Sequence, residues 1–408
     1  MIALAAGALA AETARSAASF VDSIGVNTHF SYWDTPYGKR FDEVARLLER
    51  SGIRHVRDSV VLGQTRVCDE ERTLAATGIR FDYITQPALR PADLTAWASC
   101  VGPAIESYEG PNEYDISHPQ ADGDWARTVR TFQRTLYGAV KGSAALRDLP
   151  VIGPSLTSKG AFDAVGDLSA YLDAGNVHDY FAGHEPETPG FGPGGYGSIA
   201  YNLGIAAAVS RAKPVEATET GYGTAAQPGN VSEAVQAAYV PRMFLDQFLA
   251  GIVRTDEYEL VDEGGPPYSA MGLLASDLRP KPAFTALSAM IGLLHGDGSL
   301  GTLARVPLAL AGDTANVRHA LFETAPDRCY VALWQATASV EPRLHVPLPV
   351  PERRVRVELG RPWTAGRVFT YDDAGRLAGV PARERASVPV ALGERVVFVE
   401  LARTAAAR

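Results

Sequence analysis

Short runs of β-branched and aromatic residues alternate with longer amphipathic segments along residues 20–290. Runs of this length and composition are typical of strands, and apolar residues at helical spacing between them indicate helices. Strands that alternate with helices favour a parallel sheet. We expect eight strands, at 24–28, 55–59, 81–85, 105–109, 151–155, 177–181, 215–219 and 258–262.

The segment 40–51 shows the helical pattern most clearly. Its apolar residues lie on one side of a helix, and Gly52 follows as a stop signal. These apolar residues are Phe41, Val44, Leu47 and Leu48. Similar patterns predict helices over 125–145, 231–252 and 282–294.

Eight strand-then-helix units in about 270 residues match a (β/α)8 barrel in number and length. The alternative is an open doubly wound sheet, which commonly carries a glycine-rich phosphate turn after its first strand. No G-x-G-x-x-G motif follows the run at 24–28. We therefore predict an α/β fold whose catalytic (β/α)8 TIM barrel covers residues 20–294.

The pattern of hydrophobic and polar residues changes after residue 294. Alternating segments at 328–334, 343–348, 355–359 and 395–401 are separated by Pro, Gly and Asp turns, which predicts a small C-terminal antiparallel β-sandwich over 295–408. We expect this accessory domain to brace the barrel, because such sandwiches usually bury apolar surface against it; glycan binding is the alternative.

Residues 1–19 read as an N-terminal leader or the remnant of a signal segment. They begin with a short apolar run followed by small residues, although a basic leading region is missing. We expect a secreted or cell-surface protein, with a cytoplasmic one as the alternative. No later segment approaches 18 uninterrupted apolar residues, so we expect no stable membrane insertion.

Composition narrows the class of protein. With 46% hydrophobic and 21% charged residues, the chain reads as globular, and its formal net charge of -9 disfavours a nucleic-acid partner. The three cysteines cannot form a disulfide scaffold. One bridge between Cys68 and Cys100 and three free thiols, with Cys329, both remain open.

Two glutamates stand at the ends of predicted strands, where barrel enzymes place their active sites. Glu113 follows the fourth run and Glu219 ends the seventh. Strand alternation puts Glu219 on the face of residues 215 and 217, which we take as the inward face, and Glu216 on the other. Paired carboxylates across a cleft are what glycoside cleavage requires.

The motifs around these glutamates resemble a known family. Gly110-Pro-Asn-Glu113 and Thr218-Glu-Thr-Gly221 resemble the signature of the clan A retaining glycoside hydrolases, which include families 5 and 39. The resemblance implies that Glu113 is the acid/base, Glu219 the nucleophile and Asn112 the partner of the sugar 2-hydroxyl. The family 5 tryptophan after strand eight is absent, so the chain looks closer to family 39 and its relatives.

Further residues fit the same resemblance, although each has a structural alternative. Arg57 resembles the clan's arginine that keeps the nucleophile ionised. His178 and Tyr180 resemble its His-x-Tyr, whose tyrosine also reaches the nucleophile. The supporting candidates around the sugar subsite are Asn27, His29, Trp33 and, more weakly, Tyr258. Glu106 and Glu109 read as structural carboxylates or as residues that support the active site from behind.

The sequence therefore predicts a retaining glycoside hydrolase that cleaves a polysaccharide or oligosaccharide by double displacement. We expect Glu113 to be kept protonated by a less polar setting and by the charge of Glu219. The alternatives are a non-catalytic carbohydrate-binding protein, a transglycosylase with the same intermediate, and a different barrel enzyme such as a lyase. No cofactor or metal is expected, because the histidines are scattered and no His-Glu-x-x-His motif occurs.

Overall fold

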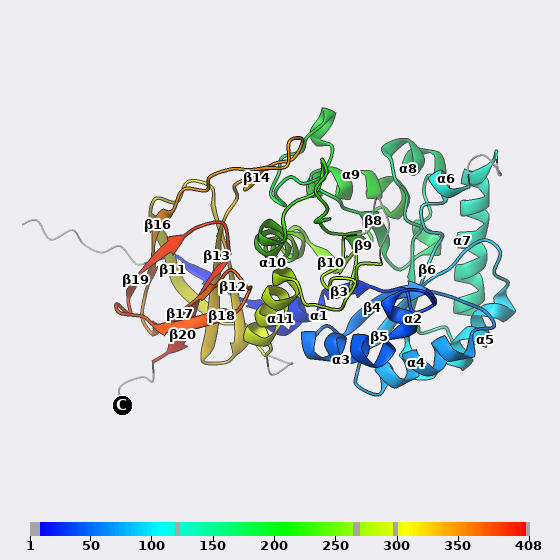
Figure 1. The fold of residues 1–408 in the computed structure, drawn as a ribbon, viewed down its shortest axis with the longest axis horizontal. Helices are drawn as coiled ribbons and strands as arrows, with labels where there is room; N and C mark the ends of the chain where they lie inside the picture. The colour runs from blue at the N-terminus through cyan, green and yellow to red at the C-terminus, as the bar shows by residue number, and fades with distance from the viewer. Residues whose placement is uncertain (1–8, 119–122, 264–269, 297–300, 405–408) are drawn as a thin grey trace, which may run out of the picture.

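The computed structural model describes residues 9–118, 123–263, 270–296 and 301–404 (Figure 1). They form a barrel of parallel strands surrounded by helices and, packed on one side of it, a pair of mostly antiparallel sheets. The predicted fold class, a (β/α)8 barrel followed by a β-sandwich, is confirmed.

The barrel is an 8-stranded parallel sheet in the order β7-β6-β5-β4-β3-β10-β9-β8. Its ends meet at a parallel bridge between Ile152 and Ala174, and the Asp173 amide donates to the Val151 carbonyl at 2.7 Å. The sheet is therefore closed. The strands are β3 (Ile24–Asn27), β4 (His55–Ser59), β5 (Arg80–Ile84), β6 (Ile105–Glu109), β7 (Val151–Ile152), β8 (Gly175–His178), β9 (Val215–Thr220) and β10 (Ile252–Glu257).

The predicted eighth strand at 258–262 is wrong. The eighth strand is β10, which begins directly after the long helix ends at Gly251 in a left-handed C-cap with φ 92°. Its sequence is rich in charged residues, and Asp256 is buried inside the barrel near Arg254. Because these inward residues are polar, the strand lacks the hydrophobic pattern on which the prediction relied.

Helices surround the barrel (Figure 1). The predicted helix at 40–51 is α3, which buries Val44 and Leu48 and ends at Gly52 with φ 84°. The α-helices are α1 (Ala17–Asp22), α2 (Pro36–Lys39), α3 (Phe41–Ser51), α4 (Thr65–Ala75), α5 (Pro91–Val101), α6 (Tyr114–Ser117), α7 (Trp125–Gly142), α8 (Lys159–Val165), α9 (Ile199–Ser210), α10 (Glu233–Ala250) and α11 (Pro282–Leu294). Short 3-10 turns are η1 (Gly102–Ala104), η2 (Ser169–Tyr171) and η3 (Pro193–Gly195).

The C-terminal sandwich consists of a 4-stranded sheet, β1-β11-β16-β19, and a 6-stranded sheet, β18-β17-β20-β13-β12-β2, with a separate β14-β15 pair. Its strands after the barrel are β11 (Arg305–Gly312), β12 (Val317–Ala325), β13 (Arg328–Gln335), β14 (Val340–Glu341), β15 (Val346–Pro347), β16 (Arg353–Leu359), β17 (Trp363–Tyr371), β18 (Leu377–Pro381), β19 (Ser387–Leu392) and β20 (Val397–Arg403).

Strand β13 is buried on both of its faces. Val331 and Leu333 lie in the core between the two sheets, whereas Ala332 and Trp334 belong to the core that includes the barrel helices. Apolar residues therefore occupy consecutive positions of one strand. The sandwich presents a full sheet face to the barrel, in agreement with a bracing role.

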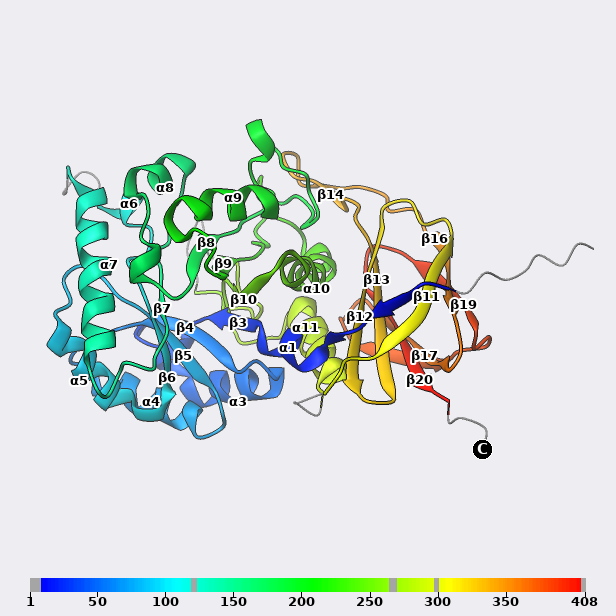
Figure 2. The same cartoon turned by 180° about the vertical axis from the view of Figure 1, so that it is seen from behind.

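The chain enters the barrel from the sandwich. Strand β1 (Ala11–Thr13) pairs with β11, and β2 (Arg15–Ser16) pairs with β12 (Figure 2). These strands fall inside the segment 1–19, read from the sequence as a leader or its remnant, of which residues 1–8 lie outside the described part. Residues 11–16 contribute strands to both sheets of the accessory domain.

Cys68 on α4 and Cys100 on α5 form a disulfide, with their Cα atoms 5.6 Å apart. This resolves the two alternatives that the sequence left open. Cys329 is a buried free cysteine in β13. Within the described ranges, no helix combines the length and apolar character needed to cross a membrane.

Candidate active site

The two candidate catalytic glutamates meet at the carboxyl ends of the barrel strands. Glu219 lies in β9, and Glu113 follows the turn after β6. A carboxylate oxygen of each lies within 4.8 Å of the other and of a ring nitrogen of His178. The structure thus brings together three residues that are far apart in the sequence.

A tight turn positions Glu113. A Cβ atom at Gly110 would lie 2.2 Å from Gln133 Oε1 and 2.8 Å from the Pro154 nitrogen, so only glycine fits there. Glu113 itself adopts a left-handed backbone conformation with φ 43°, which is uncommon for a residue with a side chain. Its amide donates to the Ser155 carbonyl at 3.2 Å. Strained backbone of this kind clusters at functional sites.

A bulge in β9 positions Glu219. Ala217 packs into the core that β9 forms with α8 and α9, so it faces the helices and not the barrel interior. Glu216 interacts electrostatically with Arg254, Glu106 and His55, which come from other strands and meet it inside the barrel. The parity predicted from strand alternation is therefore wrong. The register against β8 shifts between Ala217 and Glu219, and this irregularity turns Glu219 into the site.

Arg57 on β4 is the centre of the site. Its Nη1 donates to Glu219 Oε1 at 2.7 Å and to Asn27 Oδ1 at 2.8 Å. Its Nε and Nη2 form a bidentate pair with Glu109 at 2.6 and 2.8 Å. Nη2 also donates to Asn112 Oδ1 at 2.7 Å. All five N–H donors of a guanidinium are thereby used.

The charges of Arg57 and Glu109 are buried, and buried charges are costly unless they are paired. Arg57 is 1% exposed and Glu109 is fully buried. Although burial opposes the charged form, the carboxylates of Glu109 and Glu219 hold the pKa of Arg57 well above its ordinary value. The guanidinium is a permanent positive charge beside Glu219.

Tyr180 and His178 complete the surroundings of Glu219. The Tyr180 hydroxyl donates to Glu219 Oε2 at 3.0 Å. His178 Nδ1 lies 2.7 Å from Glu113 Oε1 and 3.4 Å from Glu219 Oε2, so the ring bridges the two carboxylates. Burial lowers the pKa of His178, but the charge of Glu219 and the hydrogen bond to Glu113 outweigh this effect and raise it.

The electrostatics of Glu113 differ from the expectation. Burial raises its pKa, but the hydrogen bond from His178 and the positive charges of His178 and Arg57 are stronger together, and the pKa lies below its ordinary value. The sequence led us to expect a protonated Glu113. The contact with His178, which the sequence motifs did not predict, reverses that expectation.

The remaining predicted residues differ in how deeply they are buried around the site. Asn27 is buried behind Arg57, and its Nδ2 donates to the Thr218 carbonyl at 3.0 Å, so it supports the site from below. Trp33 is 51% exposed, and the Arg66 guanidinium lies 3.9 Å from its ring centroid.

His29 and Tyr258 lie together beside the catalytic pair. Their ring centroids are 5.7 Å apart, and His29 is hydrogen-bonded to Glu263 and lies 3.4 Å from Glu259 Oε2. Burial lowers the pKa of His29, but hydrogen bonds to Glu259 and Glu263 raise it to about 10. Burial raises the pKa of Tyr258, and the nearby charges of Glu259 and then Glu219 raise it further.

Glu109, expected to be structural or to support the site from behind, is the bidentate partner that fixes Arg57. Two other residues of the site were not predicted from sequence. Glu259 and Glu263, which hold His29, were missed because the eighth strand was placed too late. With β10 ending at Glu257, strand-end position would have identified both as candidates.

Two groups of side chains have ligand atoms close enough to share one cation, namely Glu113 with His178 and Glu219, and His29 with Glu259 and Glu263. In the first group, Arg57 and Tyr180 already donate to Glu219. The buried guanidinium also supplies the positive charge that a cation would bring. We assign no metal to either group.

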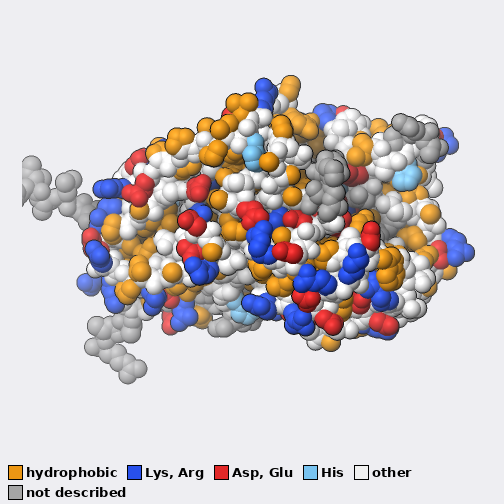
Figure 3. Space-filling view, in the orientation of Figure 1, with side chains coloured by type: hydrophobic (Ala, Val, Ile, Leu, Met, Phe, Trp, Pro, Cys, Tyr) orange, Lys and Arg blue, Asp and Glu red, His pale blue; other side chains and the backbone are white. Residues whose placement is uncertain are grey.

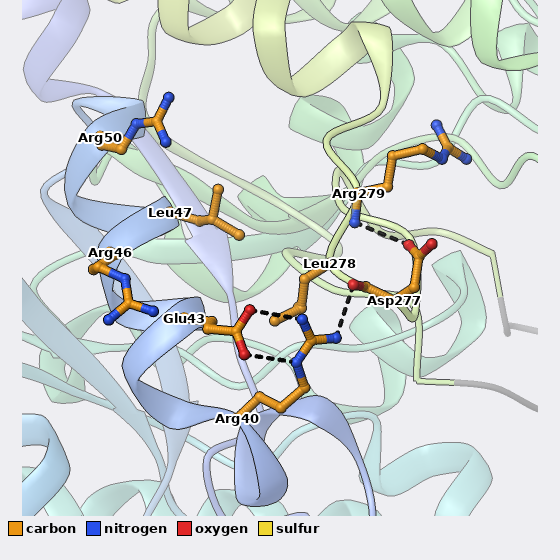
Figure 4. Close-up of a pocket in the computed structure, with 8 residues that line it drawn as sticks. All are labelled: Arg40, Glu43, Arg46, Leu47, Arg50, Asp277, Leu278 and Arg279. Atoms are coloured by element: carbon orange, nitrogen blue, oxygen red, sulfur yellow. Dashed lines mark hydrogen bonds and ion pairs between the residues drawn. The ribbon is translucent and has the colours of Figure 1, made fainter.

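A separate groove of about 400 Å³ lies between α3 and the loop at 277–279 (Figure 4). Leu47 and Leu278 line it, together with several arginines. Arg40 forms a bidentate pair with Glu43 at the edge of this groove. None of the candidate catalytic residues lines it. On the molecular face in Figure 3, basic and acidic side chains are interspersed over both the barrel and the sandwich.

No family model matches the sequence, and no curated protein matches it. Among solved structures, a family 39 glycoside hydrolase from Bacteroides cellulosilyticus WH2 is similar at a TM-score of 0.59 and 16% identity, covering 95% of this chain and 82% of that chain. A β-glucuronidase 2 mutant from Bacteroides uniformis follows at a TM-score of 0.49 and 12% identity, covering 91% and 45%. An exo-β-1,4-mannosidase from an Opitutaceae bacterium follows at 0.47 and 14%, covering 69% and 62%.

The similarity to the family 39 structure extends over both the barrel and the sandwich, since it covers 95% of this chain. It confirms, at the level of the fold, the resemblance that the motifs around Glu113 and Glu219 predicted.

Proposed function

We propose that this protein is a retaining glycoside hydrolase with Glu219 as nucleophile and Glu113 as acid/base. The observation that carries the proposal is the close approach of the two carboxylates: one oxygen of Glu113 and one oxygen of Glu219 lie within 4.8 Å of each other, and His178 Nδ1 contacts both groups. Retaining enzymes hold their two carboxyl groups about 5–5.5 Å apart, whereas inverting enzymes leave about 6.5–9.5 Å for a water molecule. The short separation supports double displacement.

The surroundings of Glu219 suit a nucleophile. Arg57 and Tyr180 donate one hydrogen bond to each of its oxygens, and donors of this kind favour the ionised carboxylate. In the first step Glu219 attacks the anomeric carbon while Glu113 protonates the departing oxygen. In the second step Glu113 accepts a proton from water, which displaces Glu219 and restores the anomeric configuration.

Asn112 is oriented to meet the sugar. Its Oδ1 accepts hydrogen bonds from Arg57 Nη2 at 2.7 Å and from Ser155 Oγ at 3.0 Å, which fixes the amide and directs its NH2 group away from both donors. An amide held in this way can donate to the sugar 2-hydroxyl, a contact that strengthens in such transition states.

The substrate is a polysaccharide or oligosaccharide, and the enzyme acts outside the cytoplasm. The exposed ring of Trp33 offers an apolar face on which a sugar can stack. The Cys68–Cys100 bridge supports export, because disulfides persist in oxidising compartments and are rare in the cytosol.

The test is a screen of nitrophenyl glycosides and polysaccharides with the full chain and with Glu113→Gln, Glu219→Gln and the control Glu49→Gln on α3. We expect hydrolysis with retained anomeric configuration, seen by proton NMR of the first product. Glu219→Gln should lose at least about 1,000-fold in kcat/KM on every substrate, Glu113→Gln should lose about as much on polysaccharides and oligosaccharides, whose leaving groups need a proton, and Glu49→Gln should change neither.

A second measurement separates the two glutamates. Azide should restore turnover of an activated aryl glycoside by Glu113→Ala and yield a glycosyl azide of retained configuration. An inverted first product would replace the retaining mechanism with an inverting one. Binding of glycans without any cleavage would favour the carbohydrate-binding alternative.

A further inference from the structure

His178 is the only described side chain that bridges the two catalytic carboxylates through one atom. Its Nδ1 is 2.7 Å from Glu113 Oε1 and 3.4 Å from Glu219 Oε2. The side chain is 4% exposed, so water does not compete for this nitrogen. Two ionised carboxylates this close repel each other, and a proton on Nδ1 relieves the repulsion between them.

The other ring nitrogen has a different environment. Nε2 of His178 is buried and has no hydrogen-bond partner among the described residues. A proton on Nε2 therefore has no acceptor to which it can pass. The proton on Nδ1, which points at Glu113, is the mobile one.

The charges around the ring depend on the state of Glu219. The groups that face His178 are Glu113, Glu219 and Arg57, and burial together with Arg57 opposes a charged ring. The charge of Glu219 is the largest of the effects that favour the imidazolium. That charge disappears when Glu219 becomes an ester in the glycosyl-enzyme.

We infer that His178 holds the acid proton in the resting enzyme and exchanges it with Glu113 as Glu219 loses and regains its charge. This inference rests on the proposed function and adds to it. His178 acts through Glu113 and does not itself protonate the substrate.

The proton balance closes over one turnover. The Nδ1 proton moves to Glu113 Oε1, Glu113 passes it to the glycosidic oxygen as the bond to the leaving group breaks, and Glu219 forms the ester. His178 is then neutral with its proton on Nε2, and Glu113 is ionised. Water next gives a proton to Glu113 as its oxygen displaces Glu219, and that proton returns to Nδ1.

The experiment is a nitrogen NMR titration of the full chain labelled with 15N-histidine, with His178→Asn used to assign the signal. We expect both ring nitrogens of His178 to be protonated at pH 6, with a midpoint above the ordinary value of about 6.5. Glu219→Gln imitates the uncharged ester, and it should lower the midpoint by at least about one pH unit.

Glu263→Gln is the matched control. It makes the same carboxylate-to-amide change beside another largely enclosed histidine, His29, and should shift the signal of His29 while leaving that of His178 unchanged. A neutral His178 ring in the unmodified protein at pH 5.5 would overturn the inference. An unchanged midpoint in Glu219→Gln would do the same.

The titration needs no substrate, so its outcome is independent of whether hydrolysis is found. With a substrate in hand, His178→Asn should move the basic limb of the kcat/KM pH profile about one unit lower, because Glu113 must then hold the proton alone. A ring with only a structural role would lower the rate and leave the limb in place.

Discussion

Arg57 Nη1 and Glu219 Oε1 lie 2.7 Å apart, and the same guanidinium forms a bidentate pair with the buried Glu109. The pair forms where β4 and β9, which are not neighbours in the sheet, approach each other across the barrel mouth. A permanent positive charge fixed by a second carboxylate cannot turn away from Glu219. The geometry of the proposed nucleophile therefore depends on a buried residue that does not reach the substrate.

Replacing Arg57 by lysine should reduce kcat by at least about 100-fold and also destabilise the fold. Lysine keeps the charge but loses the planar fork, so Glu109 loses its bidentate partner inside the barrel. Breaking a buried pair costs about 3–5 kcal/mol. Steady-state kinetics and urea unfolding measure the two effects.

The control is Arg40→Lys, which alters another bidentate arginine–glutamate pair that lies near the surface. It should leave the unfolding free energy nearly unchanged, because the pair is exposed to solvent. Equal effects of the two lysine variants would contradict the role given to Arg57.

Tyr180→Phe should lower kcat/KM by about 10- to 100-fold. The change removes one hydrogen bond to an ionised carboxylate, which is worth about 1.5–3 kcal/mol, and each 1.4 kcal/mol corresponds to a factor of ten. Tyr371→Phe is the matched control, since its buried hydroxyl donates to the Ala286 carbonyl at 3.2 Å, away from the site. Loss of activity in both variants would indicate a general packing effect.

Trp33→Ala should raise KM by about 2- to 10-fold and leave kcat and the melting temperature nearly unchanged. The ring is half exposed and already stacked on Arg66 on one side, so its truncation removes little from the core. Stacking of a flat ring is worth about 0.5–1.5 kcal/mol. An unchanged KM on the best substrate of the screen would place the sugar elsewhere.

The protein should be more stable near pH 5 than near pH 9. Burial raises the pKa of Glu216 to about 7 and that of Asp256 to about 8. Between pH 4 and 8 the unfolded chain releases these protons while the folded barrel retains them, so stability falls as the pH rises. His29, with a pKa raised to about 10, adds stability that is complete below about pH 6.5 and is lost as the pH rises towards 10.

Urea unfolding at a series of pH values measures this slope. Glu216→Gln should flatten it between pH 4 and 7, because each pKa unit corresponds to about 1.4 kcal/mol of differential stability. A stability that increases steadily up to pH 9 would show that the buried acids are ionised in the folded state.

Replacing Cys68 and Cys100 together by alanine should lower the unfolding free energy by about 2–4 kcal/mol, since the bridge restricts the unfolded chain over a sequence separation of 32. Activity measured well below the melting temperature should be retained, because the bridge joins α4 and α5 on the outside of the barrel. The reduced unmodified protein should behave like the variant. Identical unfolding curves with and without reductant would contradict this expectation.

The sequence by itself determined the architecture and the two glutamates. Alternation of strand and helix patterns is a local property, so seven of the eight strands and α3 could be recognised without tertiary contacts. The motifs around Glu113 and Glu219 pointed to the candidate site because the carboxyl ends of barrel strands converge wherever the fold is a barrel.

Only the tertiary structure determined the position of the eighth strand, the direction of Glu219 and the protonation of Glu113. The eighth strand carries Arg254 and Asp256 inside the barrel, where Glu106 and Glu216 of other strands favour the charge of Arg254 and burial raises the pKa of Asp256 to about 8. The direction of Glu219 depends on a bulge against β8, and a bulge reverses the parity on which any reading of strand alternation relies. The protonation of Glu113 depends on His178, which lies 65 residues away along the chain and 2.7 Å away in space.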